Sequence, residues 1–456
     1  MKILLKSVLL IVVVAFTSVS GVFAACTEDN WTYSDGQCAS NFTTTRTWTK
    51  IGACTGGVTH PATETVSCIY RGANYTCQSL STYNVSIGTQ VIVSTVQEFW
   101  NAINQAESQG GNMTILIEDG TYEIASPSHY PYIEVNNVIF RSRSGNRASV
   151  VLTGGGMRAT GDTENVFGVV GNNITIADLT IGECGNHGIS VNGDNLFVHN
   201  VRIYNTYEQM LKGTDAGDGA DNGIVQCSLF EYPDGIGPQF YIGGIDVHEG
   251  NDWIVRDNTF RYIKSPDPSP DFLAEHAIHF WNASADTRVE RNRITNCDRG
   301  IGFGLGSSSH SGGLIVNNMV HTTRDVGIGL ETSPNTQVYN NSVYTQNYSN
   351  SIEYRFAATT GVKIYNNLTN AAISDRSSGS SADLRNNRTT AQASWFVGAT
   401  SGDLHLAALR TDVVDQGLTI SAVTVDYDRQ TRPQGAAYDI GADEFMPTFS
   451  YLLWTK

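Results

Sequence analysis

Short segments in which apolar and polar residues alternate recur along the second half of the chain. Five of them align without gaps: Gly244–His248, Ala277–Trp281, Gly300–Gly304, Gly327–Glu331 and Ser351–Arg355. Successive side chains of a β-strand point to opposite faces, so each segment predicts a strand with one apolar face and one mixed face. We expect the Ile, Val, Phe, Leu and Tyr positions to point inward.

The other positions of the aligned segments form two columns on the outward face. One column reads Asp246, His279, Gly302, Gly329 and Glu353, and its neighbour reads His248, Trp281, Gly304, Glu331 and Arg355. Interchangeable Ser, Thr and Lys residues are typical of a solvated face, whereas these columns hold titratable groups, a Trp and paired glycines. They predict a binding cleft whose floor is lowered at the glycines.

A second motif, an apolar pair followed by a polar turn, gives the period of the pattern. Its reference asparagines are Asn258, Asn292, Asn318, Asn341 and Asn367. Their spacing lies within the range of about 20 to 50 residues that indicates stacked repeats. Asn tolerates the left-handed backbone of tight corners, and stacked Asn amides can hydrogen-bond along the axis. The sequence therefore predicts an all-β protein, a parallel β-helix.

Both ends of the repeat region fit this architecture. Thr95–Glu98 has the pattern of a capping box, and the apolar stripe that follows it predicts a helix that plugs the open end of the coils. Ile115–Tyr122 resembles the first strand of pectate-lyase-like β-helices, and Ala436–Phe445 is similar to a sequence that closes many secreted right-handed β-helix proteins. The resemblance covers residues 85–446 and implies a right-handed parallel β-helix with an N-terminal capping helix.

The N-terminal residues have the features of an export signal. Lys2 and Lys6 precede the apolar run Val8–Phe16, and small residues follow, so residues 1–25 are predicted to be a signal peptide and the protein to be exported to the periplasm, the cell surface or the medium. Ala24-Ala25-Cys26 also permits a lipid anchor on Cys26. No later apolar run approaches the length that a membrane helix needs, so no transmembrane span is expected.

Five of the eight cysteines lie near the N-terminus: Cys26, Cys38, Cys54, Cys68 and Cys77. They predict a disulfide-stapled module over residues 26–80. If Cys26 is lipidated, the other four make two bridges; otherwise one thiol is left over. The segment from Trp31 to Cys68 is weakly similar to a thrombospondin type 1 repeat, in which Trp and Arg side chains stack. Residues 447–456 are expected to form a C-terminal tail.

Composition and charge narrow the classes of partner. The formal net charge is −16, which disfavours nucleic acid because counterion release needs a basic face. The acidic stretch Asp215–Asn222 offers oxygen ligands for Ca²⁺, although it does not match an EF-hand loop. No other cofactor is indicated, and we expect a monomer.

Two families of uronate-modifying enzymes resemble the outward columns. Gly244–Glu249 is similar to the catalytic strand of mannuronan C5-epimerases, which carries Asp-Pro-His on the positions of Asp246 and His248, with a Lys one coil earlier. Lys212 precedes Asp246 by the length of one coil. The family's Tyr is replaced by Gly243, so Tyr241 is the nearest tyrosine, and Val247 replaces the Pro.

The segment Glu208–Gly213 also looks like uronate lyases of the alginate and dermatan type, although their acid, an Arg just before His-Gly, has no counterpart here. Both families begin by removing the C5 proton of a uronate, which needs a base and positive charge on the carboxylate. The resemblance implies catalytic roles for Lys212, Asp246, His248 and Tyr241.

These observations predict a lyase that cleaves an acidic, uronate-containing polysaccharide by β-elimination. A C5-epimerase is the first alternative, and a non-catalytic carbohydrate-binding or adhesive surface protein is the second. The remaining outward residues are expected to bind the sugar chain, with an aromatic face against a pyranose: His279, Trp281, Glu331, Glu353 and Arg355.

Overall fold

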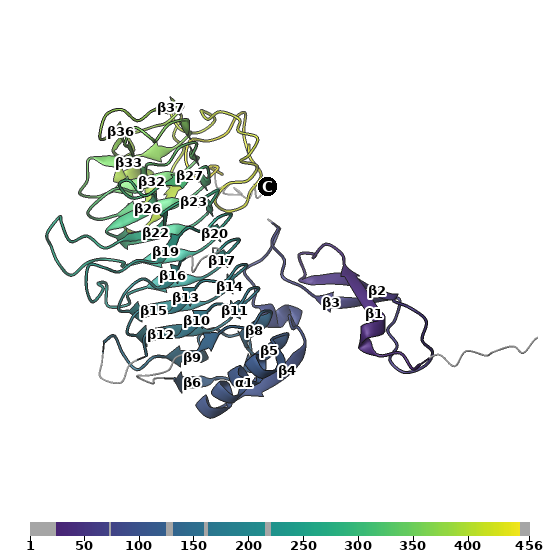
Figure 1. Ribbon diagram of the computed structural model, residues 1–456. Helices are drawn as coiled ribbons and strands as arrows, with labels where there is room; N and C mark the ends of the chain where they lie inside the picture. The colour runs from purple at the N-terminus through teal and green to yellow at the C-terminus, as the bar shows by residue number, and fades with distance from the viewer. Residues whose placement is uncertain (1–23, 73, 125–130, 159–162, 215–219, 447–456) are drawn as a thin grey trace, which may run out of the picture.

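The computed structural model describes residues 24–72, 74–124, 131–158, 163–214 and 220–446. The predicted signal peptide up to residue 23, the C-terminal tail and most of the proposed Ca²⁺ stretch lie outside the described residues. In the described part, three long parallel sheets of ten, twelve and ten strands wind into one stack of coils (Figure 1). This arrangement confirms the predicted all-β, pectate-lyase-like parallel β-helix.

Most coils contribute one strand to each sheet, and the broad sheet has two additional strands. The site sheet contains β7 (Tyr132–Ile133), β10 (Phe167–Val169), β13 (Ile189–Val191), β16 (Leu211–Gly213), β19 (Ile245–His248), β22 (His276–Trp281), β26 (Arg299–Phe303), β30 (Ile328–Glu331), β33 (Asn350–Arg355) and β36 (Ala372–Asp375). The broad sheet contains β4 (Thr89–Val93), β5 (Met113–Ile117), β8 (Val138–Ser142), β11 (Thr175–Ala177), β14 (Phe197–His199), β17 (Ile224–Gln226), β20 (Ile254–Arg256), β24 (Arg288–Glu290), β28 (Leu314–Val316), β31 (Gln337–Tyr339), β34 (Val362–Tyr365) and β37 (Ala382–Arg385).

The third sheet follows the first corner after the broad sheet. It contains β6 (Gly120–Glu123), β9 (Val150–Thr153), β12 (Thr180–Cys184), β15 (Arg202–Thr206), β18 (Leu229–Glu231), β21 (Thr259–Arg261), β25 (Arg293–Cys297), β29 (Met319–Thr322), β32 (Ser342–Thr345) and β35 (Leu368–Thr369). Two small pairs lie outside these sheets, β23 (Ser284–Ala285) with β27 (His310–Ser311) and β38 (Phe396–Gly398) with β39 (Asp403–Leu406). The short 3₁₀ turns are η1 (Glu28–Asn30), η2 (Leu80–Tyr83), η3 (Ala393–Trp395) and η4 (Ala399–Ser401).

The core of the stack is one continuous apolar cluster. The inward residues predicted from the alternation belong to it, and Ile245, Val247, Ile278 and Phe280 are fully buried. Aromatic rings stack between coils, as in the pair Phe230 and Phe260 with ring centroids 4.7 Å apart. Apolar burial along this cluster is the main force that holds the coils together.

Asparagine pairs form the corners between the broad and third sheets. The amide of Asn318 donates to Asn341 Oδ1 and accepts from the Asn292 amide, at 2.9 and 3.0 Å. The same bond runs from Asn258 to Asn292 and on through Asn341 and Asn367 to Asn387. The predicted stacking of Asn amides along the axis is thus confirmed.

The helix α1 (Val96–Gln109) lies at the N-terminal end of the stack (Figure 1). Phe99, Ala102, Ile103 and Ala106 are buried against the core, as expected for a plug. Thr95 caps the helix by accepting from the Glu98 backbone NH. The Glu98 side chain accepts from Ser94 instead of Thr95, so the reciprocal half of the predicted box is shifted by one residue.

The N-terminal residues form a small antiparallel sheet of β1 (Trp31–Asp35), β2 (Thr43–Lys50) and β3 (Thr63–Ser67) that lies beside the stack (Figure 1). The Arg46 guanidinium lies 3.8 Å from the Tyr33 ring centroid. The thrombospondin resemblance stays a prediction. Among the described residues, no helix has the length and apolar character that crossing a membrane requires.

The disulfides differ from the expected pairing within the module. Cys26 pairs with Cys54 and Cys38 with Cys68, while Cys77 pairs with Cys227 in the coil stack. A Cys26 sulfur in a disulfide is not available for a lipid thioether, so this pairing disagrees with the lipid-anchor alternative. Three disulfides are typical of an oxidising compartment, which agrees with export.

Candidate functional site

Strand register places the predicted catalytic residues on neighbouring coils of the site sheet. Lys212 in β16 pairs with Asp246 in β19, which pairs with His279 in β22. His248 pairs with Trp281 on the same two strands. Because parallel strands in register bring paired side chains together, the gapless alignment of the sequence segments predicted these contacts correctly.

Lys212 contacts two of the other predicted catalytic residues. Its ammonium group donates hydrogen bonds to Asp246 Oδ2 at 2.5 Å and to His248 Nε2 at 2.8 Å. An ammonium group has no acceptor, so Nε2 of His248 accepts and the proton of its neutral ring is on Nδ1. Lys212 is buried, which leaves its charge to interact strongly with these two partners.

Asp246 is held as a carboxylate below the surface. Burial disfavours its charge, but the Lys212 ammonium bonded to it outweighs burial and holds the pKa of Asp246 below its ordinary value. Its second oxygen, Oδ1, accepts from Trp281 Nε1 at 2.8 Å. Asp246 therefore fixes both Lys212 and Trp281.

Trp281 and His248 form an aromatic ledge. The indole lies parallel to the His279 ring at a centroid distance of 5.5 Å, and the His248 ring meets it edge-on at 4.3 Å. The side chain of His248 keeps 22 % of its surface exposed. These two residues thus remain at the surface while Asp246 lies beneath them.

The lowered floor predicted at the paired glycines is filled at Gly302, whereas Gly304 and Gly329 line a small cavity. The His276 imidazole lies over Gly302, where an added Cβ would stand 2.7 Å from its ring. His279 and Glu353 are also covered, each being 1 % exposed. Glu353 accepts from Tyr348 and Asn350 at 2.6 Å each, so it supports the surface from below.

A small cavity of about 60 Å³ continues the site toward the later coils. Its lining includes Glu331 and Arg355, which form an ion pair at 2.8 Å, together with Glu353. Two residues that the sequence reading did not assign to substrate, His276 and Arg299, also line it. The predicted substrate residues are therefore split between the aromatic ledge and this cavity.

Tyr241 lies before β19 and is 41 % exposed. Burial of its hydroxyl raises the pKa of Tyr241, and the negative charge of Asp246 raises it further. The hydroxyl therefore keeps its proton at neutral pH and is able to donate it.

The sequence analysis assigned neither Glu275 nor its neighbour His276 to the site. In the structure Glu275, His276 and His279 converge, each offering one metal-ligating atom within 4.8 Å of the others. The available signal was the glycine pair Gly302 and Gly329, which makes room for a large side chain from an adjacent coil.

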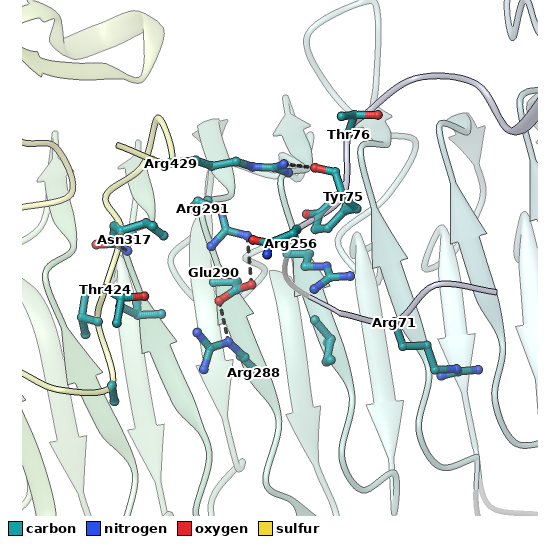
Figure 2. Close-up of a pocket in the computed structure, with 16 residues that line it drawn as sticks. Arg71, Tyr75, Thr76, Arg256, Arg288, Glu290, Arg291, Asn317, Thr424 and Arg429 are labelled. Atoms are coloured by element: carbon teal, nitrogen blue, oxygen red, sulfur yellow. Dashed lines mark hydrogen bonds and ion pairs between the residues drawn. The ribbon is translucent and has the colours of Figure 1, made fainter. Parts of the chain in front are cut away.

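A larger cavity of about 640 Å³ lies over the broad sheet, between the segment around Tyr75 and a loop near the C-terminus (Figure 2). Figure 2 shows Glu290 between Arg288 and Arg291, and both arginines bind it. Arg291 and Arg429 also bind Asp257. Two further arginines of the lining bind neutral groups, Arg256 the Gln226 amide oxygen and Arg71 two backbone carbonyls, so the cavity keeps an excess of positive charge. The predicted catalytic residues lie on the site sheet, which therefore carries the candidate site.

No protein-family model matches the chain, and no curated protein matches it. Among solved structures, pectate lyase Pel9A aligns with a TM-score of 0.57 at 14 % identity, covering 81 % of this chain and 99 % of that chain. An alginate lyase from Paenibacillus sp. str. FPU-7 aligns with a TM-score of 0.37 at 14 % identity, over 65 % of this chain and 97 % of that chain. The A-module of the Azotobacter vinelandii mannuronan C-5 epimerase AlgE6 gives 0.38 and 13 %, over 65 % of this chain and 90 % of that chain. The likeness to Pel9A shows the shared parallel β-helix fold.

Proposed function

We propose that this protein is a polysaccharide lyase that cleaves a uronate-containing chain by removing the C5 proton and eliminating the C4 oxygen. The observation that carries the proposal is the buried Lys212 ammonium shared between Asp246 and a surface histidine, His248. This arrangement supplies the two things the first step needs, a positive charge for the uronate carboxylate and a neutral imidazole as base.

Substrate binding and base activation are coupled in this mechanism. The Asp246 carboxylate pairs with the Lys212 ammonium, while the bond from Lys212 to His248 Nε2 occupies the lone pair of the imidazole. When the uronate carboxylate takes that Lys212 hydrogen bond, Nε2 is released to accept the C5 proton. The base is therefore activated only when the substrate is in place.

Elimination then requires an acid for the leaving oxygen. The electron pair of the C5–H bond forms the C4–C5 double bond, the C4–O bond breaks, and the leaving oxygen takes a proton. Tyr241 fits this role because it is exposed at the site and keeps its proton. A water molecule returns the proton from His248 to Tyr241 after product release.

A C5-epimerase shares the first step and differs only in the second. If Tyr241 delivers its proton to C5 from the opposite face of the ring, the product is the epimer and the chain stays intact. The match of Lys212, Asp246 and His248 to the epimerase pattern favours this second candidate.

One experiment separates the candidates. The protein is incubated in D₂O with separate polyuronates, polymannuronate, polyguluronate and polygalacturonate, while absorbance of the unsaturated product and deuterium at C5 are followed together. We expect absorbance to rise with one of these polymers. Deuterium at C5 without absorbance would replace the lyase by the epimerase, and neither signal with any polyuronate would refute C5 proton abstraction.

A further inference from the structure

We propose that Glu275, His276 and His279, here called the Glu275 cluster, bind one divalent transition-metal ion of the zinc type. The three residues come from the start of β22 and the residue before it, directly beside Asp246. The inference rests on side-chain geometry and does not depend on the lyase assignment.

Three atoms of the cluster are buried without a hydrogen-bond partner among the described residues. They are Glu275 Oε2, His276 Nδ1 and His279 Nδ1. The two histidines are 6 % and 1 % exposed. Leaving a buried polar group unsatisfied costs about 1–3 kcal/mol, so three in one place indicate a missing common partner.

The hydrogen bonds of His279 define what that partner must be. Its Nε2 lies 3.2 Å from Gly304 O, a carbonyl that can only accept, so Nε2 carries a proton. Nδ1 lies 3.5 Å from Asp246 Oδ1 and 3.7 Å from Glu275 Oε2. Nδ1 therefore faces two carboxylate oxygens across a gap that a cation would fill.

The second imidazole is available as a ligand. Nδ1 of His276 is buried without a hydrogen-bond partner among the described residues, so this nitrogen is open to coordinate an ion. The fold also makes space for this ring, since a Cβ on Gly302 would stand 2.7 Å from it. Real Cβ atoms do not approach this closely, so glycine there serves the His276 ring.

The donor set selects the class of metal. Two imidazole nitrogens and a carboxylate oxygen suit Zn²⁺ and its neighbours, whereas Ca²⁺ prefers oxygen alone. A tetrahedral zinc site keeps its ligand atoms about 3.4 Å apart, so the Glu275–His279 separation of 3.7 Å is already close. The side chain of Glu275 is 21 % exposed, so the cluster lies close to the surface.

A second group with metal-ligating atoms, His405, Asp428 and Asp443, provides a contrast. There His405 is within 2.6 Å of Asp403 and 3.3 Å of Asp428. Asp428 and Asp403 raise the pKa of His405 to about 9, against a smaller opposing effect of burial. This histidine is a cation in an ion pair, so it serves as a matched control.

The test uses the full chain, stripped with EDTA and dialysed, and titrated with Zn²⁺ by calorimetry and with Co²⁺ by visible absorption. We expect one ion per chain and a d–d spectrum of low coordination number. His279→Gln and Glu275→Gln should each weaken binding at least ~100-fold, the upper effect of losing an outer-shell partner. Gly302→Ala, which displaces His276 without changing a ligand, should weaken binding as well.

His405→Gln should bind Zn²⁺ like the unaltered protein. His248→Ala should also keep its Zn²⁺, which separates this site from the proposed catalytic base. Equal Zn²⁺ affinity of the unaltered protein and His279→Gln would overturn the proposal and assign a shared proton to these atoms. Circular dichroism of each variant establishes that a loss of binding is not a loss of fold.

Discussion

At the scale of single residues, His248 is the group whose removal tests the chemistry most directly. Changing His248→Ala should lower kcat/KM on a turned-over polyuronate at least ~100-fold, the lower range for one general acid or base. Stability should change little, because the ring is partly exposed and Lys212 keeps its bond to Asp246.

His60→Ala is a matched control for this variant. Its side chain is 18 % exposed, against 22 % for His248, and it also packs on a tryptophan, Trp48. Both variants should melt at similar temperatures while only His248→Ala loses turnover. A His248→Ala enzyme as active as the control would exclude proton transfer by this imidazole.

Single residues also show which parts of the site the sequence could not predict. The alternation placed Asp246, His248 and Trp281 correctly because strand register repeats from coil to coil. It could not reveal that His276 covers Gly302, since side-chain direction at the start of β22 depends on packing between coils. Burial of Glu353 by Tyr348 and Arg376 was hidden for the same reason.

At the scale of elements, the two residues of each Asn-Asn corner have different structural roles. Asn317, Asn340 and Asn366 have φ values of 54, 49 and 57°, the left-handed backbone of the corner. The following residues carry the amide ladder. The sequence indicated both the left-handed backbone and the amide ladder, but only the structure shows which residue of each pair has which role.

Replacing an Asn of the amide ladder should therefore lower the free energy of unfolding more in the middle of the ladder than at its end. Asn318→Ala removes donors to Val289 O and Val316 O and an acceptor for Asn292, all buried. Each unsatisfied group costs about 1 kcal/mol or more, so the free energy of unfolding should fall by about 3 kcal/mol. Asn387→Ala, at the half-exposed end, should cost about 1 kcal/mol because water replaces its bonds. Urea midpoints compare the two, and equal shifts would contradict a cooperative ladder.

At the scale of the whole molecule, the N-terminal segment is fastened to the coil stack by covalent and polar contacts. Cys77 is bonded to Cys227, and Arg71 donates to Asn222 O and Asn195 O. This link could not be predicted, because the sequence spacing of cysteines does not determine their connectivity. The coil period, in contrast, could be predicted from the second half of the chain, because each coil there repeats the same Asn corner and the same apolar core positions.

His199 lies at this junction and should make stability depend on pH. Its ring is fully buried, close to Gln78 O at 2.7 Å and to the Gln226 amide at 3.0 Å. Burial lowers the pKa of His199 to about 4, against a smaller opposing effect of Gln78.

Between that pKa and the ordinary value of 6.5, the unfolded chain binds a proton at His199 and the folded chain does not. Stability therefore falls as the pH drops from 6.5 to 4. A shift of this size in the pKa of His199 corresponds to about 3 kcal/mol in the free energy of unfolding. In His199→Gln an amide replaces both bonds without titrating, so its free energy of unfolding should match that of the unaltered protein at pH 7.5 and exceed it at pH 4.5. Urea unfolding at both pH values measures the difference, and parallel pH curves for the two proteins would show that His199 does not carry this acid sensitivity.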